Sequence, residues 1–217
     1  MILAAGRGER MRPLTDVLPK PLLQVHGKAL IVWHIEKLAQ KGFEEIIINI
    51  AHLGHKIPEI LGDGAQWGVK ISYSDERSCG ALESAGGIIK ALPLLGTETF
   101  LVLNGDIFCD YDFDPAFALQ DKLAHLVLVP NPPHNPAGDF ALEGALLCNE
   151  GEKKYTFSGI AYYNPKMFQA KKEEKSALAP LLREMAQKGI LSAELYHGVW
   201  HDIGTPQRLE AINEEKL

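Results

Sequence analysis

Short apolar runs alternate with segments of helical periodicity through the first half of the chain, and this alternation narrows the choice of folds more than any other feature. The apolar runs lie at residues 2–5, 45–51, 69–74 and 100–104, and the helical spacing at residues 29–41, 56–61 and 83–92. The run at 45–51 is rich in isoleucine, as is typical of strands buried on both faces. This β-α-β order predicts an α/β fold with a mostly parallel, doubly wound central sheet.

The second half of the chain has a different pattern. Extended segments are predicted at residues 125–129, 139–142, 145–148, 155–162 and 195–203, and helices at residues 114–120, 177–188 and 206–214. A proline-rich loop at 130–138 follows the first of these strands. Several short strands in succession favour a smaller antiparallel part beside the parallel sheet.

Charge and cysteine content exclude several classes of protein. The net charge of −6 argues against a general nucleic-acid-binding protein, although residues 1–28 carry a local net charge of +3. Such a basic cluster suggests a small anionic ligand, and a solvated loop is the alternative. The 3 cysteines are widely spaced and fit neither a disulfide framework nor a zinc site, so we expect a reducing, cytoplasmic location. The apolar runs are also shorter than the roughly 20 residues of a membrane span.

A loop with two glycines follows the first apolar run. Its sequence is Leu3-Ala4-Ala5-Gly6-Arg7-Gly8-Glu9-Arg10-Met11-Arg12-Pro13-Leu14-Thr15. It lacks the third glycine of the dinucleotide-binding fingerprint and the Gly-Lys-Ser/Thr of a Walker loop. Its glycines nevertheless let backbone amides approach a phosphate, and two arginines follow Gly8 closely. Lys20 lies between Pro19 and Pro21, which stiffen its backbone. The sequence therefore favours a phosphate-binding loop over an exposed turn with incidental arginines.

Two aspartates follow predicted extended segments. Asp106 ends the sequence Asn104-Gly105-Asp106, and Asp202 lies within residues 200–206, just before the last predicted helix. Ligands of open α/β sheets bind at the carboxyl ends of strands, where Asp106 is expected. The two carboxylates together would hold Mg²⁺ and share it with substrate phosphates. Each aspartate alone is also compatible with an ordinary helix or turn cap.

These segments, in this order, resemble the sugar-1-phosphate nucleotidylyltransferases. The resemblance is carried by residues 3–15, by Pro19-Lys20-Pro21-Leu22, by Asn104-Gly105-Asp106 and by residues 200–206, and it spans essentially the whole chain. It implies a Rossmann-like three-layer α/β/α fold with a mostly parallel central sheet and a smaller antiparallel, sugar-binding part. It also implies one domain over residues 1–217, with a nucleotide-binding half (about 1–110), a sugar-phosphate-binding half (about 111–217) and no C-terminal β-helix.

The resemblance also implies a reaction and a set of residues. The reaction transfers a nucleotidyl group from a nucleoside triphosphate to a sugar 1-phosphate and releases pyrophosphate. The implied catalytic residues are Arg10, Lys20 and Asp106. The implied nucleotide-binding residues are Ala4, Ala5, Gly6, Gly8, Glu9, Arg10, Lys20, Glu83 and Gly86. The implied sugar-phosphate-binding residues are Asn104, Asp139, Glu143, Ser158 and Gly159. Asp106 and Asp202 are the implied metal ligands for one or two Mg²⁺ ions, with Mn²⁺ as a substitute.

Further segments narrow the resemblance within the family. They lie at residues 51–54, 82–88, 91–96, 124–129, 138–140 and 156–160 and point to UTP and N-acetylmuramate 1-phosphate, hence to nucleotide-sugar biosynthesis for peptidoglycan recycling. Guanylyl transfer to mannose 1-phosphate, transfer to another sugar 1-phosphate, and a non-catalytic nucleotide-sugar sensor are the alternatives. We expect a monomer or small homo-oligomer without nucleic-acid or membrane partners. The family usually has a few residues before the position of Met1, so the chain is expected to start short of the full N-terminus.

Two departures from the family pattern limit the assignment of sugar-binding residues. Relatives that act on glucose carry a Glu-Lys-Pro segment, where this chain has Glu152-Lys153-Lys154, so neither lysine is given a role. The second half also offers no obvious arginine for the lactyl carboxylate of a muramic acid. Arg183 and Arg208 are candidates for that carboxylate by elimination only.

Overall fold

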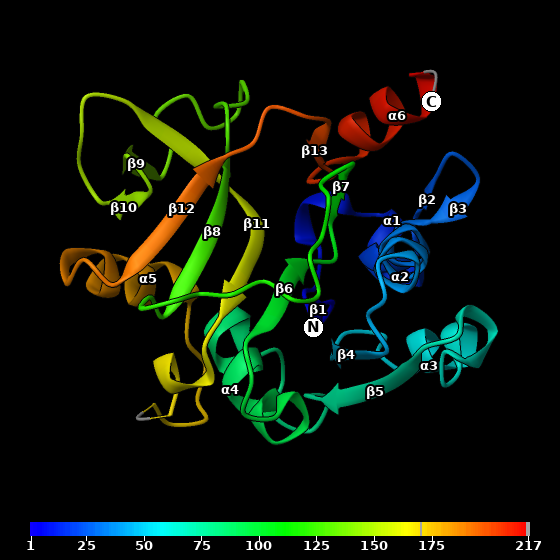
Figure 1. Ribbon diagram of the computed structural model, residues 1–217. Helices are drawn as coiled ribbons and strands as arrows, with labels where there is room; N and C mark the ends of the chain where they lie inside the picture. Colours follow the sequence, from blue (N-terminus) through cyan, green and yellow to red (C-terminus); the bar gives the residue numbers. More distant parts are fainter. Residues whose placement is uncertain (170, 216–217) are drawn as a thin grey trace.

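The computed structural model describes residues 1–169 and 171–215 (Figure 1). Its helices are α1 (Leu14–Val17), α2 (Leu30–Gln40), α3 (Lys56–Leu61), α4 (Glu83–Leu95), α5 (Leu178–Gln187) and α6 (Pro206–Glu214). Its strands are β1 (Ile2–Leu3), β2 (Gln24–Val25), β3 (Lys28–Ala29), β4 (Glu45–Ile50), β5 (Lys70–Asp75), β6 (Phe100–Asn104), β7 (Ile107–Cys109), β8 (Ala124–Val129), β9 (Phe140–Glu143), β10 (Leu146–Cys148), β11 (Lys154–Tyr163), β12 (Leu191–Leu195) and β13 (Trp200–Asp202).

A central sheet runs through the molecule in the order β5-β4-β1-β6-β11-β8-β12-β10-β9. The strands β5, β4, β1 and β6 are mutually parallel. Beyond them, β11 is antiparallel to both β6 and β8. Strand β9 pairs with β10 and also with β11, so this end of the sheet curls back on itself. The predicted parallel sheet and the smaller antiparallel part are both confirmed.

Helices cover both faces of the sheet. Successive residues of a strand face opposite sides, so a strand that is apolar throughout needs helices packed on both sides. On β6, Phe100 and Val102 pack in one buried cluster with residues of α4 and α5. Leu101 and Leu103 pack on the other face in a second cluster with Ile31 of α2 and other residues of that helix. These two clusters fill the two interfaces between the sheet and its helix layers, which gives the predicted three-layer α/β/α fold (Figure 1).

A third buried cluster joins the end of the chain to its beginning. Met11, Val25, Ile203 and Ile212 are almost fully buried against one another. In Figure 1 the helix α6 accordingly lies beside β2 and β3. The Asn213 side chain of α6 accepts a hydrogen bond from the His26 backbone N–H at 2.6 Å and donates to the Gln24 carbonyl at 3.2 Å. The C-terminal helix therefore braces the loop that follows β1.

The structure corrects two predictions for the second half. Residues 114–120 have an irregular conformation, with turns at 115–116 and 120, instead of the predicted helix. Phe117 stacks on Tyr162 with ring centroids 4.2 Å apart, and Leu119 is buried two residues later, a spacing that a helix does not offer to one surface. The extended segment predicted at 195–203 is two strands, β12 and β13, separated by a link. Strand β12 begins at Leu191, and its alternation of buried and less buried residues was missed.

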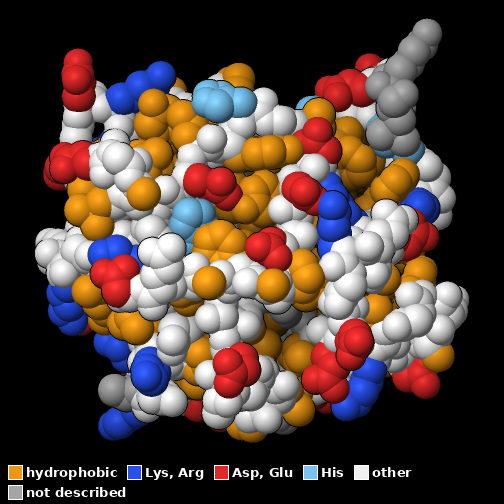
Figure 2. All heavy atoms as spheres, viewed as in Figure 1, with side chains coloured by type: hydrophobic (Ala, Val, Ile, Leu, Met, Phe, Trp, Pro, Cys, Tyr) orange, Lys and Arg blue, Asp and Glu red, His pale blue; other side chains and the backbone are white. Residues whose placement is uncertain are grey.

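The surface and the helices bear on possible partners. Among the described residues, no helix combines the length and the apolar character that a membrane crossing requires. On the face seen in Figure 2, Lys and Arg side chains are scattered among acidic and hydrophobic ones.

His34, on α2, makes the stability of the protein pH-dependent. Burial lowers the pKa of His34 to about 4, against an opposing hydrogen bond with the Ile107 backbone. Because the unfolded chain keeps a pKa near 6.5, acid protonates the unfolded state first. We expect this group to cost about 3 kcal/mol of unfolding free energy between about pH 7 and about pH 4. Denaturant unfolding of the wild type and of His34→Gln over this range measures the effect. An equal loss of unfolding free energy in the wild type and in His34→Gln would contradict the predicted effect of His34.

Candidate active site

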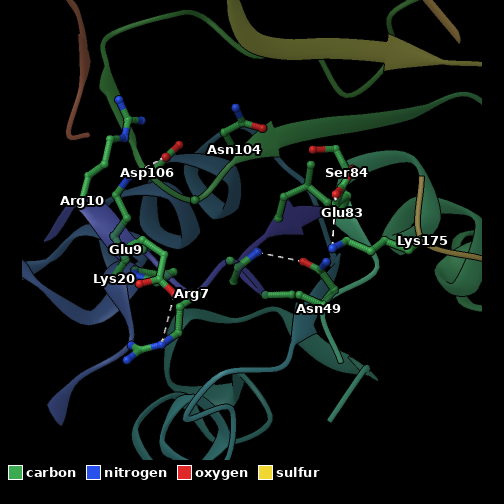
Figure 3. Close-up of a pocket in the computed structure, with 18 residues that line it drawn as sticks. Arg7, Glu9, Arg10, Lys20, Asn49, Glu83, Ser84, Asn104, Asp106 and Lys175 are labelled. Carbon is green, nitrogen blue, oxygen red and sulfur yellow. Dashed lines mark hydrogen bonds and ion pairs between the residues drawn. The ribbon is translucent and has the colours of Figure 1, made fainter. Parts of the chain in front are cut away.

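A cavity of about 480 Å³ opens at the carboxyl ends of the parallel strands (Figure 3). Its walls come from the loop after β1, the loop before α4, and the turn between β6 and β7. The predicted site residues that line it are Ala4, Ala5, Gly6, Gly8, Glu9, Arg10, Lys20, Glu83, Asn104 and Asp106. The predicted site residues outside its lining are Gly86, Asp139, Glu143, Ser158, Gly159 and Asp202. The structure thus gathers most of the predicted nucleotide-binding residues in one place.

The loop after β1 has a conformation that requires glycine at one position. Gly8 has φ +67°, and a Cβ there would lie 2.9 Å from Thr15 Cγ2. The Thr15 hydroxyl donates a hydrogen bond to the Gly8 carbonyl at 2.8 Å, which closes the loop. At Gly6 an added Cβ would meet no atom within 4 Å. The loop is therefore rigid at Gly8 and open at Gly6, where the backbone remains accessible from the cavity.

The three arginines of this loop make different contacts. Arg7 donates hydrogen bonds to the Thr15 carbonyl and to the Asp16 carboxylate, both at 2.7 Å. The bond to Asp16 is the main reason why the pKa of that carboxyl group is lowered. Arg12 pairs with Glu9 and Asp16. Arg10 lines the cavity and makes no ion pair with residues 1–169 or 171–215. Arg7 and Arg12 thus brace the loop, whereas the charge of Arg10 is not neutralised by an ion pair within the described part of the chain.

Lys20 and Asp106 form the central ion pair of the cavity. The Lys20 Nζ donates to Asp106 Oδ2 at 2.6 Å. Lys20 begins a short helical turn after Pro19 and is 8% exposed, whereas Asp106 follows β6 in the turn before β7. The low exposure of Lys20 strengthens its electrostatic interactions relative to those of a surface lysine. A cation is thus held at the carboxyl end of the central strands.

Asp202 lies beside Asp106 although it does not line the cavity. Strands β7 and β13 pair so that Asp202 is opposite Ile107, and the Ile203 N–H donates to the Asp106 carbonyl at 2.9 Å. The Asp202 Oδ2 accepts from Arg208 Nη1 at 2.6 Å and lies 3.1 Å from His134 Nε2. A Cβ added at Gly204 would lie 2.9 Å from Asp202 Oδ1 and 3.3 Å from Arg10 Nη2. Asp202 Oδ1 and Arg10 therefore approach the same spot.

The carboxylates of Asp106 and Asp202 fit a divalent cation by their chemistry. Each engages its Oδ2 with a basic side chain, and oxygen donors of this kind suit hard cations. Residues 1–169 and 171–215 hold no group of three or more His, Cys, Asp or Glu side chains arranged to bind a metal ion. A cation here would therefore take its other ligands from substrate phosphates and water, as Mg²⁺ usually does.

The start of α4 is shaped by a segment from the second half of the chain. Glu83 begins the helix with φ +62°, a conformation that non-glycine residues rarely adopt. The Ser176 carbonyl accepts hydrogen bonds from the Ala85 and Gly86 N–H groups at 3.0 and 3.2 Å, and its own N–H donates to the Leu82 carbonyl. Lys175 Nζ lies 3.6 Å from Glu83 Oε1. The segment around Ser176 thus caps the helix and completes one wall of the cavity.

Gly86 lies against this segment, and an alanine there should push it away. A Cβ at Gly86 would lie only 2.4 Å from the Glu174 carbonyl oxygen. Because this is a backbone atom, Gly86→Ala should cost about 1–3 kcal/mol of stability and raise the KM for the nucleotide. Thermal unfolding and initial rates test both effects, with Lys175→Ala as the stability control. Unchanged stability would contradict the expected clash. A direct nucleotide contact for Gly86 stays a prediction.

The predicted sugar-binding residues fall into three groups. Asn104 lines the cavity and adjoins Gly159, where a Cβ would lie 2.5 Å from Asn104 Nδ2. The buried Ser158 donates to the Val127 carbonyl at 2.7 Å, and Asp139 accepts from the Phe157 N–H at 2.8 Å, so both side chains bind backbone groups of other residues. Glu143 is exposed at the end of β9. Sugar contacts for these residues stay predictions, and the structure places Asn104 and Gly159 best for them.

Several residues of the cavity lining were not predicted from the sequence. Asn49 interrupts the apolar run of β4 and lines the cavity, and a polar residue in such a run is a signal that was missed. Lys175 lies in a stretch rich in Lys and Glu, which offers no comparable signal. Ala81 and Ser84 belong to the loop that leads into α4.

The fold and the cavity define a class, and comparisons with known proteins agree with it. Residues 1–142 match the family model described as nucleotidyl transferase, and the chain belongs to this family, among its sugar-1-phosphate nucleotidylyltransferases. It is 52% identical to an N-acetylmuramate α-1-phosphate uridylyltransferase of Neisseria meningitidis serogroup B, over 97% of this chain and 94% of that protein. The predicted family is thereby confirmed.

More distant relatives extend the comparison. A mannose-1-phosphate guanylyltransferase catalytic subunit beta of Danio rerio is 28% identical over 95% of this chain, which spans only 61% of that protein. A crystal structure titled as a putative glucose-1-phosphate thymidylyltransferase from Bacillus anthracis, in complex with sucrose, superposes with a TM-score of 0.85. The superposition covers 98% of this chain and 92% of the Bacillus anthracis chain, at 24% sequence identity. This likeness supports the fold.

Proposed function

We propose that this protein joins UTP and N-acetylmuramate 1-phosphate to give UDP-N-acetylmuramate and pyrophosphate. The observation that carries the proposal is the near full-length identity to the Neisseria enzyme, which acts on N-acetylmuramate α-1-phosphate by its name. The cavity with its Lys20–Asp106 pair supplies the chemistry that such a reaction needs. The product would serve nucleotide-sugar biosynthesis in peptidoglycan recycling.

The reaction is a displacement at phosphorus that requires alignment and charge neutralisation. A phosphate oxygen of the sugar 1-phosphate forms a bond to the α-phosphorus of UTP, while the bond to the bridging β-phosphate oxygen breaks and pyrophosphate leaves with the electron pair. The attacking phosphate has a second pKa near 6 and is largely dianionic at neutral pH, so it needs no general base. Catalysis then depends on fixed cations and on the positions of the reactants.

The scheme gives a role to several residues of the cavity. Gly6 and Gly8 let backbone N–H groups approach the triphosphate. Arg10, which is free of ion pairs within the described part of the chain, binds the departing phosphates. Lys20 neutralises the α-phosphate and the incoming phosphate. Ala4, Ala5 and the loop at Glu83 bind the base, and Asn104 with Gly159 faces the sugar.

A divalent metal ion completes the site. The family generally uses one, and we propose one or two Mg²⁺ ions held by Asp106 and Asp202, with Mn²⁺ as a substitute. When bound, the ion neutralises negative charge on the reacting phosphates. The pairing of β7 with β13, which makes Asp202 and the residue after Asp106 neighbours across the two strands, supports this proposal.

The proposal also covers the domain organisation, the oligomeric state and the cellular location of the protein. We propose one domain over residues 1–217, with the nucleotide half at about 1–110 and the sugar-phosphate half at about 111–217. We propose a monomer or small homo-oligomer in the cytoplasm, because the free cysteines Cys79, Cys109 and Cys148 fit a reducing compartment.

A substrate panel tests the proposed function. Pyrophosphate release is measured with Mg²⁺ for UTP, GTP, CTP and dTTP, each crossed with the 1-phosphates of N-acetylmuramate, N-acetylglucosamine, glucose and mannose. We expect strong turnover with UTP and the muramate ester. Turnover with GTP and mannose 1-phosphate, the reaction named for the Danio rerio relative, would keep the mechanism and replace the substrates. Folded protein without turnover for any pair would favour a non-catalytic nucleotide-sugar sensor.

A further inference from the structure

A buried chain of hydrogen bonds connects the two walls of the cavity between which the base is proposed to bind. The Ala4 N–H donates to Asn49 Oδ1 at 2.7 Å, and Asn49 Nδ2 donates to Glu76 Oε1 at 2.7 Å. The Leu82 N–H donates to Glu76 Oε2 at 2.8 Å. Ala4 belongs to the loop after β1, and Leu82 immediately precedes Glu83 in the opposite wall. Figure 3 shows Asn49 beneath Glu83 and Ser84.

The direction of each hydrogen bond dictates the residue types in this chain. Both ends are backbone N–H groups, which can only donate. Asn49 must therefore turn its carbonyl oxygen to Ala4 and its amide nitrogen to Glu76. Glu76 then receives a donor at each oxygen, and an ionised carboxylate is the side chain that accepts at both. A glutamine at this position would set its NH₂ group against one of the two donors.

Burial makes this carboxylate costly and its position well defined. Glu76 is 0% exposed, and it makes no ion pair within residues 1–169 and 171–215. Burying a polar carboxyl group is unfavourable unless hydrogen bonds compensate for the lost water, as they do here at both oxygens. On α4, a Cβ at Gly87 would lie 2.7 Å from Asn49 Nδ2 and 2.8 Å from Glu76 Oε1, so the helix packs directly on the pair. Such an arrangement leaves little freedom for Asn49 and Glu76 to shift.

The chain ends at a strained part of the cavity wall. Glu83 has φ +62° and lines the cavity, and residues in rare conformations persist only where their surroundings hold them. Leu82 is held on one side by Glu76 and on the other by the Ser176 N–H, which donates to its carbonyl at 2.9 Å. The Glu76 carboxylate therefore fixes the distance between Ala4 and the loop at Glu83.

We infer that Asn49 and Glu76 are positioning residues that set the spacing of the two cavity walls between which the nucleobase is proposed to bind. The inference rests on the proposed function and deepens it. Neither side chain takes part in the displacement at phosphorus, so their loss should weaken nucleotide binding and leave the chemical step nearly unchanged.

Glu76→Gln tests this role, because it keeps the shape of the side chain and removes one acceptor. We expect the KM for UTP to rise roughly 10- to 100-fold, as for the loss of a buried hydrogen bond to a charged group. We expect kcat and the KM for the sugar 1-phosphate to change by less than about 3-fold. Asp75→Asn is the matched control, because Asp75 is the neighbouring carboxylate and pairs with Arg77 outside the cavity lining.

A second pair of variants keeps the test decisive if Glu76→Gln does not fold. Asn49→Ala removes the middle of the chain, and Gly87→Ala pushes on it from α4. Either variant, when folded, should show the same split between KM and kcat. An unchanged KM for UTP in a folded variant, or a loss confined to kcat, would overturn the inference. Direct binding of UTP to the wild type, measured by calorimetry, distinguishes a failure of this inference from a failure of the proposed function. If the wild type does not bind UTP, the proposed function itself is overturned.

Discussion

Replacing Lys20 with alanine is expected to lower kcat by roughly 10²- to 10³-fold, the range found when one preorganised electrostatic donor is removed. The Lys20 Nζ lies 2.6 Å from Asp106 Oδ2 and is largely buried, so it is already in place before substrates bind. Negative charge from two phosphates must meet at the reacting phosphorus, and without Lys20 this charge is less well compensated. Steady-state pyrophosphate release with saturating substrates measures the loss.

The fold should survive this substitution. Asp106 is 35% exposed, so water can solvate its carboxylate when the lysine is absent. Lys28→Ala is the matched control, because Lys28 also forms an ion pair, with Glu36 at 2.5 Å, and does not line the cavity. Full activity of Lys20→Ala would refute the catalytic role. Unfolding of this variant, with a stable Lys28→Ala, would make Lys20 a structural residue.

Asp106→Asn is expected to reduce kcat/KM by about 10²-fold or more, because it removes a proposed metal ligand and the charge partner of Lys20 together. The substitution keeps the size of the side chain, and the backbone bond from Ile203 to the Asp106 carbonyl remains. The concentration of Mg²⁺ that gives half-maximal activity should rise at the same time. A titration of activity with Mg²⁺, for wild type and variant, measures both changes.

Asp112→Asn provides the control for this experiment, because Asp112 is 79% exposed and pairs with Lys41 outside the cavity lining. It should behave as the wild type does. If Asp106→Asn kept the same Mg²⁺ dependence as the wild type and lost only turnover, Asp106 would act through Lys20 and not as a metal ligand. Near-wild-type kcat/KM would remove it from the catalytic residues.

The sequence predicted most of the central fold because its periodicity is strong there. The apolar run at 45–51 and the helical spacing of 29–41 became β4 and α2 with nearly the same bounds. The predicted helix at 114–120 failed because Phe117 stacks on Tyr162 of the interior strand β11, a tertiary contact that overrides local spacing. Strand β12 was missed because Ser192, Ala193 and Glu194 fill its middle, and none of these residues is a strong strand former.

The candidate site was predictable where glycine, proline and charge stand close together in the chain. The loop of Gly6 and Gly8 and the segment at Lys20 carry such signals, and the structure places both in the cavity lining. Glu76 carries no signal of this kind, because an acidic residue after a strand is usually exposed. Its importance follows from complete burial between two donors that are far apart in the sequence, Asn49 and Leu82.

The sequence by itself determined the alternation of strands and helices, the glycine loop that lines the cavity and the family, because these depend on residues that are near neighbours in the chain. Only the tertiary structure decided which distant residues meet. The pairing of β7 with β13 brings Asp202 beside Asp106, the segment around Ser176 caps α4, and Asn49 with Glu76 joins the two walls of the cavity. Such contacts depend on the packing of the whole chain, since a hydrogen bond acts over about 3 Å and leaves no trace in local spacing.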